Sequence, residues 1–180
     1  MGKHLQKLTP RLIEFISNQK MFFVATAMKD GKINLSPKGM DSFKVIDENR
    51  VLWLNLTGSG NETAAHLRHS DRITMMFCAF HGPPMILRLY GTAKVYHQRD
   101  TFWEDHISLF PVFNGSRQLV DVDVELVQTS CGFGVPFMDY KGERDLLDEW
   151  AKEKGKDGLM EYKRLKNAES LDGYPTGIFE

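Results

Sequence analysis

A glycine-rich turn between a predicted strand and a predicted helix is the first candidate for chemistry in this sequence. Residues 50–57 alternate apolar and polar side chains, Gly58–Gly60 end that strand, and Asn61–Thr63 open a helix. Such a turn leaves backbone N–H groups without partners at a helix start, where the dipole also favours negative charge. The hydroxyls of Thr57 and Ser59 add donors for phosphate oxygens. The spacing predicts a phosphate site, with an ordinary capped strand-to-helix turn as the alternative.

The turn lacks two known nucleotide-binding signatures. No Gly-Lys-Ser/Thr follows it, as a P-loop requires, and no third glycine completes a GxGxxG pattern. No GxSxG sequence is present, and neither cysteine has an identifiable histidine partner. Hydrolysis by a nucleophilic side chain therefore has no support here.

The stretch NLSPK supplies a second polar group. In an extended strand, Asn34, Ser36 and Lys38 share one face, opposite Ile33 and Leu35. Taken alone, this pattern is typical of a strand that faces solvent. Beside an anion site, however, Lys38 is the natural counter-charge.

Two further groups of ionisable residues have simpler explanations. His66 and His69 lie three residues apart on the predicted helix, but no third ligand is spaced near them. We therefore expect surface histidines and no metal site. Asp121, Asp123 and Glu125 alternate with apolar residues, which is typical of a solvated sheet face.

The charge balance argues against nucleic acid or anionic lipid as a partner. The chain has 23 Lys and Arg and 24 Asp and Glu, and 23 − 24 gives a formal charge of −1. Arg68, Arg72 and Arg88 could form a basic patch, but this balance gives it no support. Hydrophobic residues make up 42% and charged residues 26%, as in globular proteins.

Cysteine usage and hydropathy indicate the compartment. Cys78 and Cys131 both lie in apolar stretches, so we expect two buried thiols and no disulfide framework. The first residues lack the apolar run of a signal peptide, and the longest apolar stretch is residues 21–28. A spanning helix needs about 20 such residues. We expect a soluble, cytoplasmic protein with no membrane contact.

The pattern of predicted elements defines the fold class. Thr9-Pro10 predicts a helix start, and Gly91 inside a strand predicts a bulge or a close backbone approach. Helices are predicted over 10–20, 62–69 and 100–109, and strands over 21–28, 33–37, 50–57, 72–80, 85–96 and 119–128. After residue 135 the composition becomes helical, with a split near residues 155–158.

Six strands with short turns predict a mainly β (α+β) protein. The sequence indicates an antiparallel barrel with short helices and a helical C-terminal tail. Strands do not alternate with long helices, which argues against a doubly wound fold. We expect a barrel domain over residues 1–135 and a helical extension over 136–180 that packs on it.

The same stretches resemble the pyridoxamine 5′-phosphate oxidase-like family of flavin-binding split barrels. The resemblance runs through FFVATAMKDGKINLSPKG, RVLWLNLTGSGNETAAHLRHSDRITMMFCAF and PMILRLYGTAKV, and the CGFGVP stretch with its helical tail resembles a small bacterial branch. It implies a Greek-key split β-barrel and a homodimer that holds FMN between its subunits. It also implies a flavin-dependent oxidoreductase acting on a small molecule.

The resemblance assigns cofactor contacts to particular residues. The first flavin-contacting strand of the family matches Ser36, Pro37 and Lys38, and Lys38 is our first choice for the cation near the ring. The remaining implied contacts are Leu56 and Thr57 at the end of the next strand, Asn61, Glu62 and Thr63 at the helix start, and Arg88 on a later strand. No catalytic acid or base is identified.

This chain departs from the authentic oxidases at three places. Those enzymes carry basic residues where Glu62 and Thr63 stand, and an arginine ahead of the lysine, where this chain has Ile33 and Asn34. They also end in a segment with arginine and histidine that is absent from SLDGYPTGIFE. Synthesis of the vitamin is therefore not expected. Deazaflavin or heme in the same groove, and a flavin-binding or sensing module without catalysis, remain alternatives.

Overall fold

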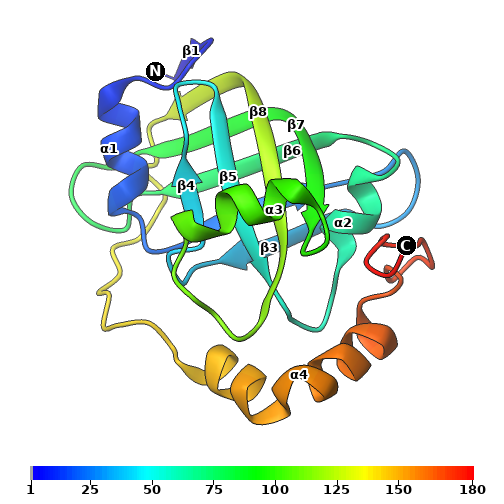
Figure 1. The fold of residues 1–180 in the computed structure, drawn as a ribbon. Helices are drawn as coiled ribbons and strands as arrows, with labels where there is room; N and C mark the ends of the chain where they lie inside the picture. Colours follow the sequence, from blue (N-terminus) through cyan, green and yellow to red (C-terminus); the bar gives the residue numbers. More distant parts are fainter. Residues whose placement is uncertain (1) are drawn as a thin grey trace.

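One curled antiparallel sheet with flanking helices forms the fold in a computed structural model that describes residues 2–180 (Figure 1). The strands are β1 Lys3–Leu5, β2 Phe22–Thr26, β3 Asn34–Lys38, β4 Phe43–Val45, β5 Arg50–Leu56, β6 Arg72–Cys78, β7 Ile86–His97 and β8 Ser116–Ser130. The helices are α1 Pro10–Asn18, α2 Glu62–Leu67, α3 Thr101–His106, the short 3₁₀ helix η1 Ile107–Leu109 and α4 Leu146–Lys166. The mainly β class predicted from the sequence is confirmed.

The strand order makes the sheet a split barrel. Neighbours follow the order β3-β2-β6-β7-β8-β5-β4, with β1 on β8, and every pair is antiparallel. Strand β2, next to one end of this series, approaches β4 at the other end, because the ring centroids of Phe22 and Phe43 are 4.9 Å apart. The loop between β3 and β4 therefore lies where the barrel is split.

The predicted irregularity at Gly91 is present. The register of β7 against β8 shifts between Tyr90 and Gly91. A Cβ atom at Gly91 would lie 1.9 Å from the carbonyl oxygen of Asp123, so only glycine permits this approach. A bulge of this kind bends the strand and helps the sheet to close.

Helix α1 closes one end of the barrel. The side chain of Thr9 accepts a hydrogen bond from the Leu12 N–H, and Pro10 occupies the first turn, as predicted. Leu12 and Ile16 then enter a core that also contains Trp53. A smaller apolar cluster on the outer face of the sheet packs beneath α3.

The C-terminal helix reaches the barrel through small residues. Gly155 in α4 has φ 64° and ψ 179°, so the helix is broken there, in agreement with the predicted split. Ala151, before the break, is 1% exposed, and its Cβ would lie only 3.3 Å from a Cβ atom added at Gly115. Residues 131–145 connect β8 to α4, around the predicted boundary at residue 135. The division into a barrel domain over residues 1–135 and a helical extension over 136–180 stays a prediction.

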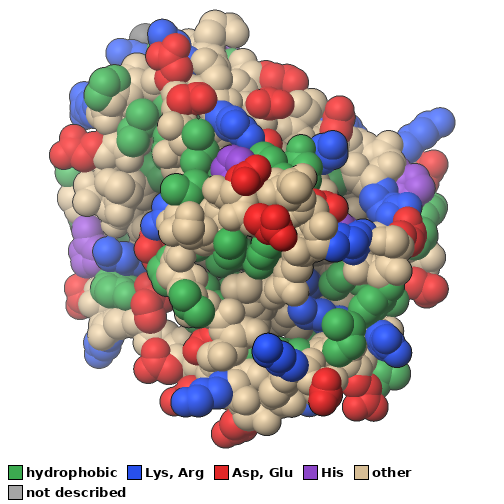
Figure 2. Space-filling model, in the orientation of Figure 1, with side chains coloured by type: hydrophobic (Ala, Val, Ile, Leu, Met, Phe, Trp, Pro, Cys, Tyr) green, Lys and Arg blue, Asp and Glu red, His purple; other side chains and the backbone are tan. Residues whose placement is uncertain are grey.

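The surface carries charges of both signs. Figure 2 shows Lys and Arg side chains interspersed with Asp and Glu over the visible face. In residues 2–180, no helix is both long and apolar enough to cross a membrane. The face that Figure 2 shows therefore presents no extended area of one sign of charge.

Candidate anion site

A cavity of about 320 Å³ lies where β3, the end of β5 and the start of α2 meet. Six of the nine residues predicted to contact a cofactor line it, namely Ser36, Lys38, Leu56, Asn61, Glu62 and Thr63. Asn34, Asn55, the Gly58–Gly60 turn and Arg117 complete the lining. The structure thus brings together the glycine turn and the polar face of NLSPK. Their roles in binding stay predictions.

The other three predicted residues lie outside this cavity. Pro37 points away from it, because its neighbours Ser36 and Lys38 face inward on an alternating strand. Thr57 is fully buried next to the cavity, and its N–H donates to the Gly115 carbonyl (2.7 Å). Arg88 is on β7, where its Nη1 donates to the Ser130 hydroxyl (3.2 Å). Within one chain, Arg88 does not contribute to this cavity.

Arg117 is the important residue that the sequence analysis missed. It is 3% exposed, its Nη1 donates to the Gly60 carbonyl (3.0 Å), and its Nε has no partner. On β8 it falls at a bulge, because Leu56 pairs with Ser116 and Asn55 pairs with Gln118. Strict alternation would place Arg117 on the face of Asp121, whereas the bulge turns it into the cavity.

Lys38 is the second cation of the cavity. Burial, reinforced by the positive charge of Arg117, lowers the pKa of Lys38 to about 8. Its Nζ lies 4.9 Å from the centroid of the Trp53 ring, a cation–π contact. The Lys38 amine is therefore charged at neutral pH, and the Trp53 ring compensates this charge only weakly.

No carboxylate neutralises these two cations. The ion pairs found within residues 2–180 involve neither Lys38 nor Arg117. Glu62 lines the cavity, but both of its carboxylate oxygens accept from the Leu171 N–H (3.0 and 3.1 Å). The one acidic side chain at the site is thus held by the C-terminal segment. The cavity has a net positive charge.

The start of helix α2 contributes less to the positive potential of the cavity than the sequence predicts. Helix α2 has only six residues, too few for a large dipole, and the Asn61 side chain makes no capping hydrogen bond. The first helical hydrogen bond runs from the Ala64 N–H to the Asn61 carbonyl (3.1 Å), so the N–H groups of Glu62 and Thr63 precede it. The positive potential comes mainly from the Arg117 and Lys38 side chains.

Asn61 instead ties the glycine turn to the C-terminal helix. Its Nδ2 donates to the Asn167 carbonyl (3.1 Å), and Asn167 Nδ2 donates to the Gly58 carbonyl (3.0 Å). Asn167 is fully buried at the end of α4. Two amide side chains therefore fix the turn that borders the cavity.

His66 also differs from the expectation of a surface histidine. It is 1% exposed, and its Nδ1 lies 3.1 Å from the Thr26 hydroxyl. Asn34 Nδ2 donates to the hydroxyls of Thr26 (3.3 Å) and Thr63 (3.1 Å). His66 thus supports the wall of the cavity through this network. Within residues 2–180, no cluster of metal-ligating side chains is found.

Several buried polar atoms around the cavity have no hydrogen-bond partner. They are Thr57 Oγ1, Asn61 Oδ1, Arg117 Nε, Gln118 Nε2 and Asn167 Oδ1. Buried polar groups are normally satisfied, and a native domain has only a few exceptions. Of these residues, Asn61 and Arg117 line the cavity, where a bound polar group can reach their unpartnered atoms.

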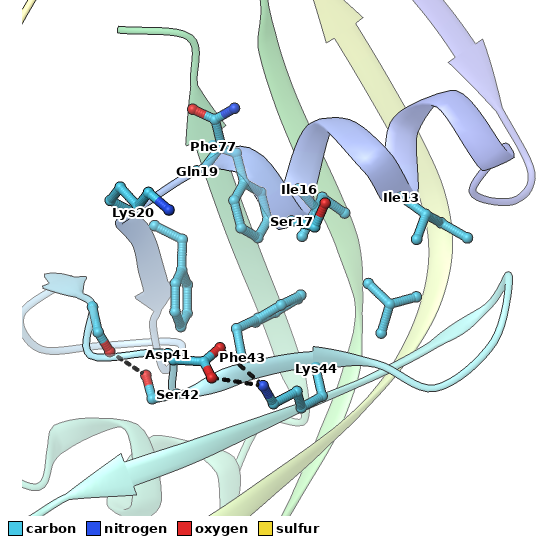
Figure 3. A pocket seen from close by; sticks show the side chains of 13 residues that line it. Ile13, Ile16, Ser17, Gln19, Lys20, Asp41, Ser42, Phe43, Lys44 and Phe77 are labelled. Atoms are coloured by element: carbon cyan, nitrogen blue, oxygen red, sulfur yellow. Dashed lines mark hydrogen bonds and ion pairs between the residues drawn. The ribbon is translucent and has the colours of Figure 1, made fainter. Parts of the chain in front are cut away.

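Another cavity of about 300 Å³ lies between α1 and β4 (Figure 3). Phe22, Phe43 and Phe77 form its apolar wall. At its rim, Lys44 Nζ contacts both carboxylate oxygens of Asp41 (2.9 Å each). None of the predicted site residues lines it.

The fold is shared with solved structures of low sequence identity. The Group A Streptococcus protein HupZ superposes with a TM-score of 0.52 at 19% identity, covering 66% of this chain and 91% of that one. A pyridoxamine 5′-phosphate oxidase candidate from Lactobacillus delbrueckii gives a TM-score of 0.53 at 20% identity, covering 68% and 94%. These similarities establish the fold alone.

Sequence comparison extends the relationship to a family. The profile described as pyridoxamine 5′-phosphate oxidase matches residues 8–131, which include every predicted contact residue and Arg117. A relative from Aspergillus flavus, the pyridoxamine 5′-phosphate oxidase family protein ustO, is 36% identical over 94% of this chain and 76% of its own length. The chain belongs to the pyridoxamine 5′-phosphate oxidase family.

Proposed function

We propose that this protein binds FMN and acts as a flavin-dependent oxidoreductase on a small molecule. The observation that carries the proposal is Arg117, a buried guanidinium that has no carboxylate partner and an unpartnered Nε beside the cavity. A guanidinium stays protonated at neutral pH, and burying it without a counter-charge is costly. A bound phosphate removes that cost.

The residues of the cavity suit a flavin phosphate. Arg117 and Lys38 supply two positive charges, which match the charge of a phosphate monoester near pH 7. Ser36, Ser59 and Thr63 add hydroxyls. A Cβ at Gly58 would have no atom within 4 Å, so the turn leaves open space. We assign the phosphate to this turn and the ribityl chain to the β3 face.

The chain's own groups position the cofactor and manage protons. When bound, FMN supplies hydride or electron transfer. Asn34 and Ser36 offer amide and hydroxyl groups along β3, on the face shared with Lys38. Because its pKa is about 8, Lys38 Nζ can both hold and release a proton near neutral pH. Burial lowers the pKa of Arg117 to about 9, so its guanidinium keeps its charge near neutral pH.

The first experiment is the visible absorption spectrum of the purified protein, followed by parallel titrations with FMN and riboflavin. The two flavins differ only in the phosphate, so we expect FMN to bind at least about 100-fold more tightly, given two charge-assisted contacts. Equal affinities would remove the phosphate assignment. Turnover of reduced nicotinamide with electron acceptors then separates an enzyme from a flavin-binding module.

The residue types that line the cavity also favour some of the alternative cofactors over others. Heme iron takes His, Cys, Met or Tyr as axial ligand, and none of these types occurs among the described residues that line the cavity. A deazaflavin with a phosphate could use the same cations. Extraction of the native cofactor and measurement of its mass distinguish FMN from a deazaflavin.

We also propose a homodimer. Strand β3 lies at one end of the strand order, and Leu35 on this strand (66% exposed) and Ile33 just before it (77% exposed) present apolar side chains to solvent. An apolar edge strand is normally covered by a partner. Light scattering tests this expectation, and a Leu35→Glu variant should shift the population to monomers.

A further inference from the structure

Lys38 lies between two cavities, and only one of them is the anion site. The second has a volume of about 440 Å³ and is formed by β3, the loop after it and residues 140–147. Residues 140–147 lie beyond the family match at 8–131, so this wall is a feature of the extension. A volume in this range accommodates a small organic ligand.

The lining of the second cavity combines apolar side chains with cations. Met21, Met40, Leu146 and Leu147 are its main apolar members. Lys20, Lys38 and Arg144 provide three positive groups. The carboxylate there, Glu143, accepts a hydrogen bond from the Tyr140 hydroxyl (2.8 Å). The cations are therefore in excess, as in the anion site.

The apolar part of this wall is not covered by the chain itself. Tyr140 is 48% exposed and Leu146 is 66% exposed, although both line the cavity. Met40, in the adjacent loop, adopts a left-handed conformation (φ 62°), which is strained for a residue with a side chain. Backbone strain of this kind concentrates at binding sites.

We propose that the second cavity is the substrate site, and that it takes a small apolar molecule, such as an aryl carboxylate, that carries one anionic group. The substrate role rests on the proposed flavin function, because it uses Lys38 as the shared wall between cofactor and substrate. The apolar residues bury the body of the ligand, and Arg144 and Lys20 pair with its anion.

The test uses a matched pair of probes, 2-naphthoate and 2-naphthamide, which share an apolar body and differ in charge. Their dissociation constants are measured by calorimetry on the FMN-titrated wild type and on Arg144→Met and Lys20→Met. Lys152→Met, an exposed α4 residue outside the cavity, is the control. FMN affinity is measured in parallel on every variant.

We expect 2-naphthoate to bind the wild type about tenfold more tightly than 2-naphthamide, as one charge-assisted contact provides. Arg144→Met should reduce this preference to about threefold or less, Lys20→Met should reduce it partly, and the control should retain it. FMN affinity should stay within about twofold in all variants.

Three results separate the two proposals. Equal or absent binding of both probes to the wild type overturns the anionic substrate class. A large loss of FMN affinity in Arg144→Met shows that the flavin itself fills this cavity and also overturns the inference. If the probes follow the expected pattern while FMN does not bind, the ligand site stands and the flavin function fails.

Discussion

The anion site and the α1–β4 cavity have almost equal volumes, about 320 and 300 Å³, but differ in how their charges are satisfied. At the α1–β4 cavity, Lys44 pairs with Asp41, and the Ser42 hydroxyl donates to the Gly39 carbonyl (2.6 Å). In the anion site, Arg117 and Lys38 lack carboxylate partners. The two cavities are alike in size, but only the anion site contains a buried guanidinium without a carboxylate partner.

This difference supports the proposal that the anion site binds a ligand. A cavity whose polar groups are satisfied within the chain gains little from a charged guest. A buried cation without a partner reduces stability in the free protein and recovers that free energy on binding. A buried charge without a partner is therefore a better guide to function here than cavity size.

The largest expected effect comes from Arg117→Met. Removing the buried guanidinium should weaken FMN binding by about 30- to 100-fold, because a charged hydrogen bond contributes about 1.5–3 kcal/mol. Riboflavin binding should hardly change. The free protein should keep its melting temperature or gain a few degrees, because an uncompensated buried charge is lost. Flavin fluorescence titration and thermal unfolding measure both effects.

Lys44→Met is the matched control for Arg117→Met. It removes a cation from the α1–β4 cavity, where the charge is already paired with Asp41. FMN affinity should stay within about twofold of the wild type. A comparable loss in both variants would mean that general surface charge, and not the Arg117 site, controls binding.

Raising the pH should weaken FMN binding through Lys38. Its pKa of about 8 means that the amine loses its charge as the pH rises from 7 to 9. Because the phosphate binds the charged form, affinity should fall as the pH rises above 8, by about tenfold in total once the amine is neutral. Lys38→Met should bind about tenfold more weakly at pH 7 and lose this component of the pH dependence. An identical pH profile in both proteins would exclude Lys38 from the site.

A smaller loss is expected when the glycine turn loses its anchor. Asn167→Ala removes the donor to the Gly58 carbonyl and should lower the free energy of unfolding by about 1–2 kcal/mol. FMN affinity should fall by about threefold to fivefold, because the turn becomes mobile while both cations remain. Asn167→Asp tests whether the amide donor itself matters, since it keeps the shape and should behave no better than alanine.

The smallest effect is expected at Thr57. Its hydroxyl is buried without a partner and lies outside the cavity lining. Thr57→Val should leave FMN affinity within about twofold and raise stability by up to about 1 kcal/mol. A large loss of FMN affinity would show that the hydroxyl rotates to meet the ligand, and it would restore the contact predicted from the sequence.

Much of the fold could be predicted because its signals are local. The structure confirms three features that neighbouring residues alone predict. They are the helix start at Thr9-Pro10, the strand over 50–57 and the irregularity at the glycine inside a strand. The short strands β1 and β4 were missed. Each has three residues, too few for a periodic pattern to be recognised.

The site was only half predictable, for a physical reason. Ser36, Lys38 and the glycine turn stand out by spacing, whereas Arg117 sits in a strand whose alternation places it on the other face. Its position depends on a bulge that arises from pairing with β5, 60 residues earlier in the chain. Likewise, nothing local in the sequence indicates that the distant Leu171 N–H donates to the Glu62 carboxylate.

The ties of the C-terminal segment have a consequence for biosynthesis. Asn167 and Leu171 hold the wall of the anion site, and Asp172 pairs with Lys32 between β2 and β3. During translation the barrel strands leave the ribosome well before these residues, and domains fold largely in that order. A nascent barrel thus lacks part of the wall of the anion site. We therefore expect the proposed FMN to reach full affinity only in chains that have been completed through the end of α4 and the turn that follows it.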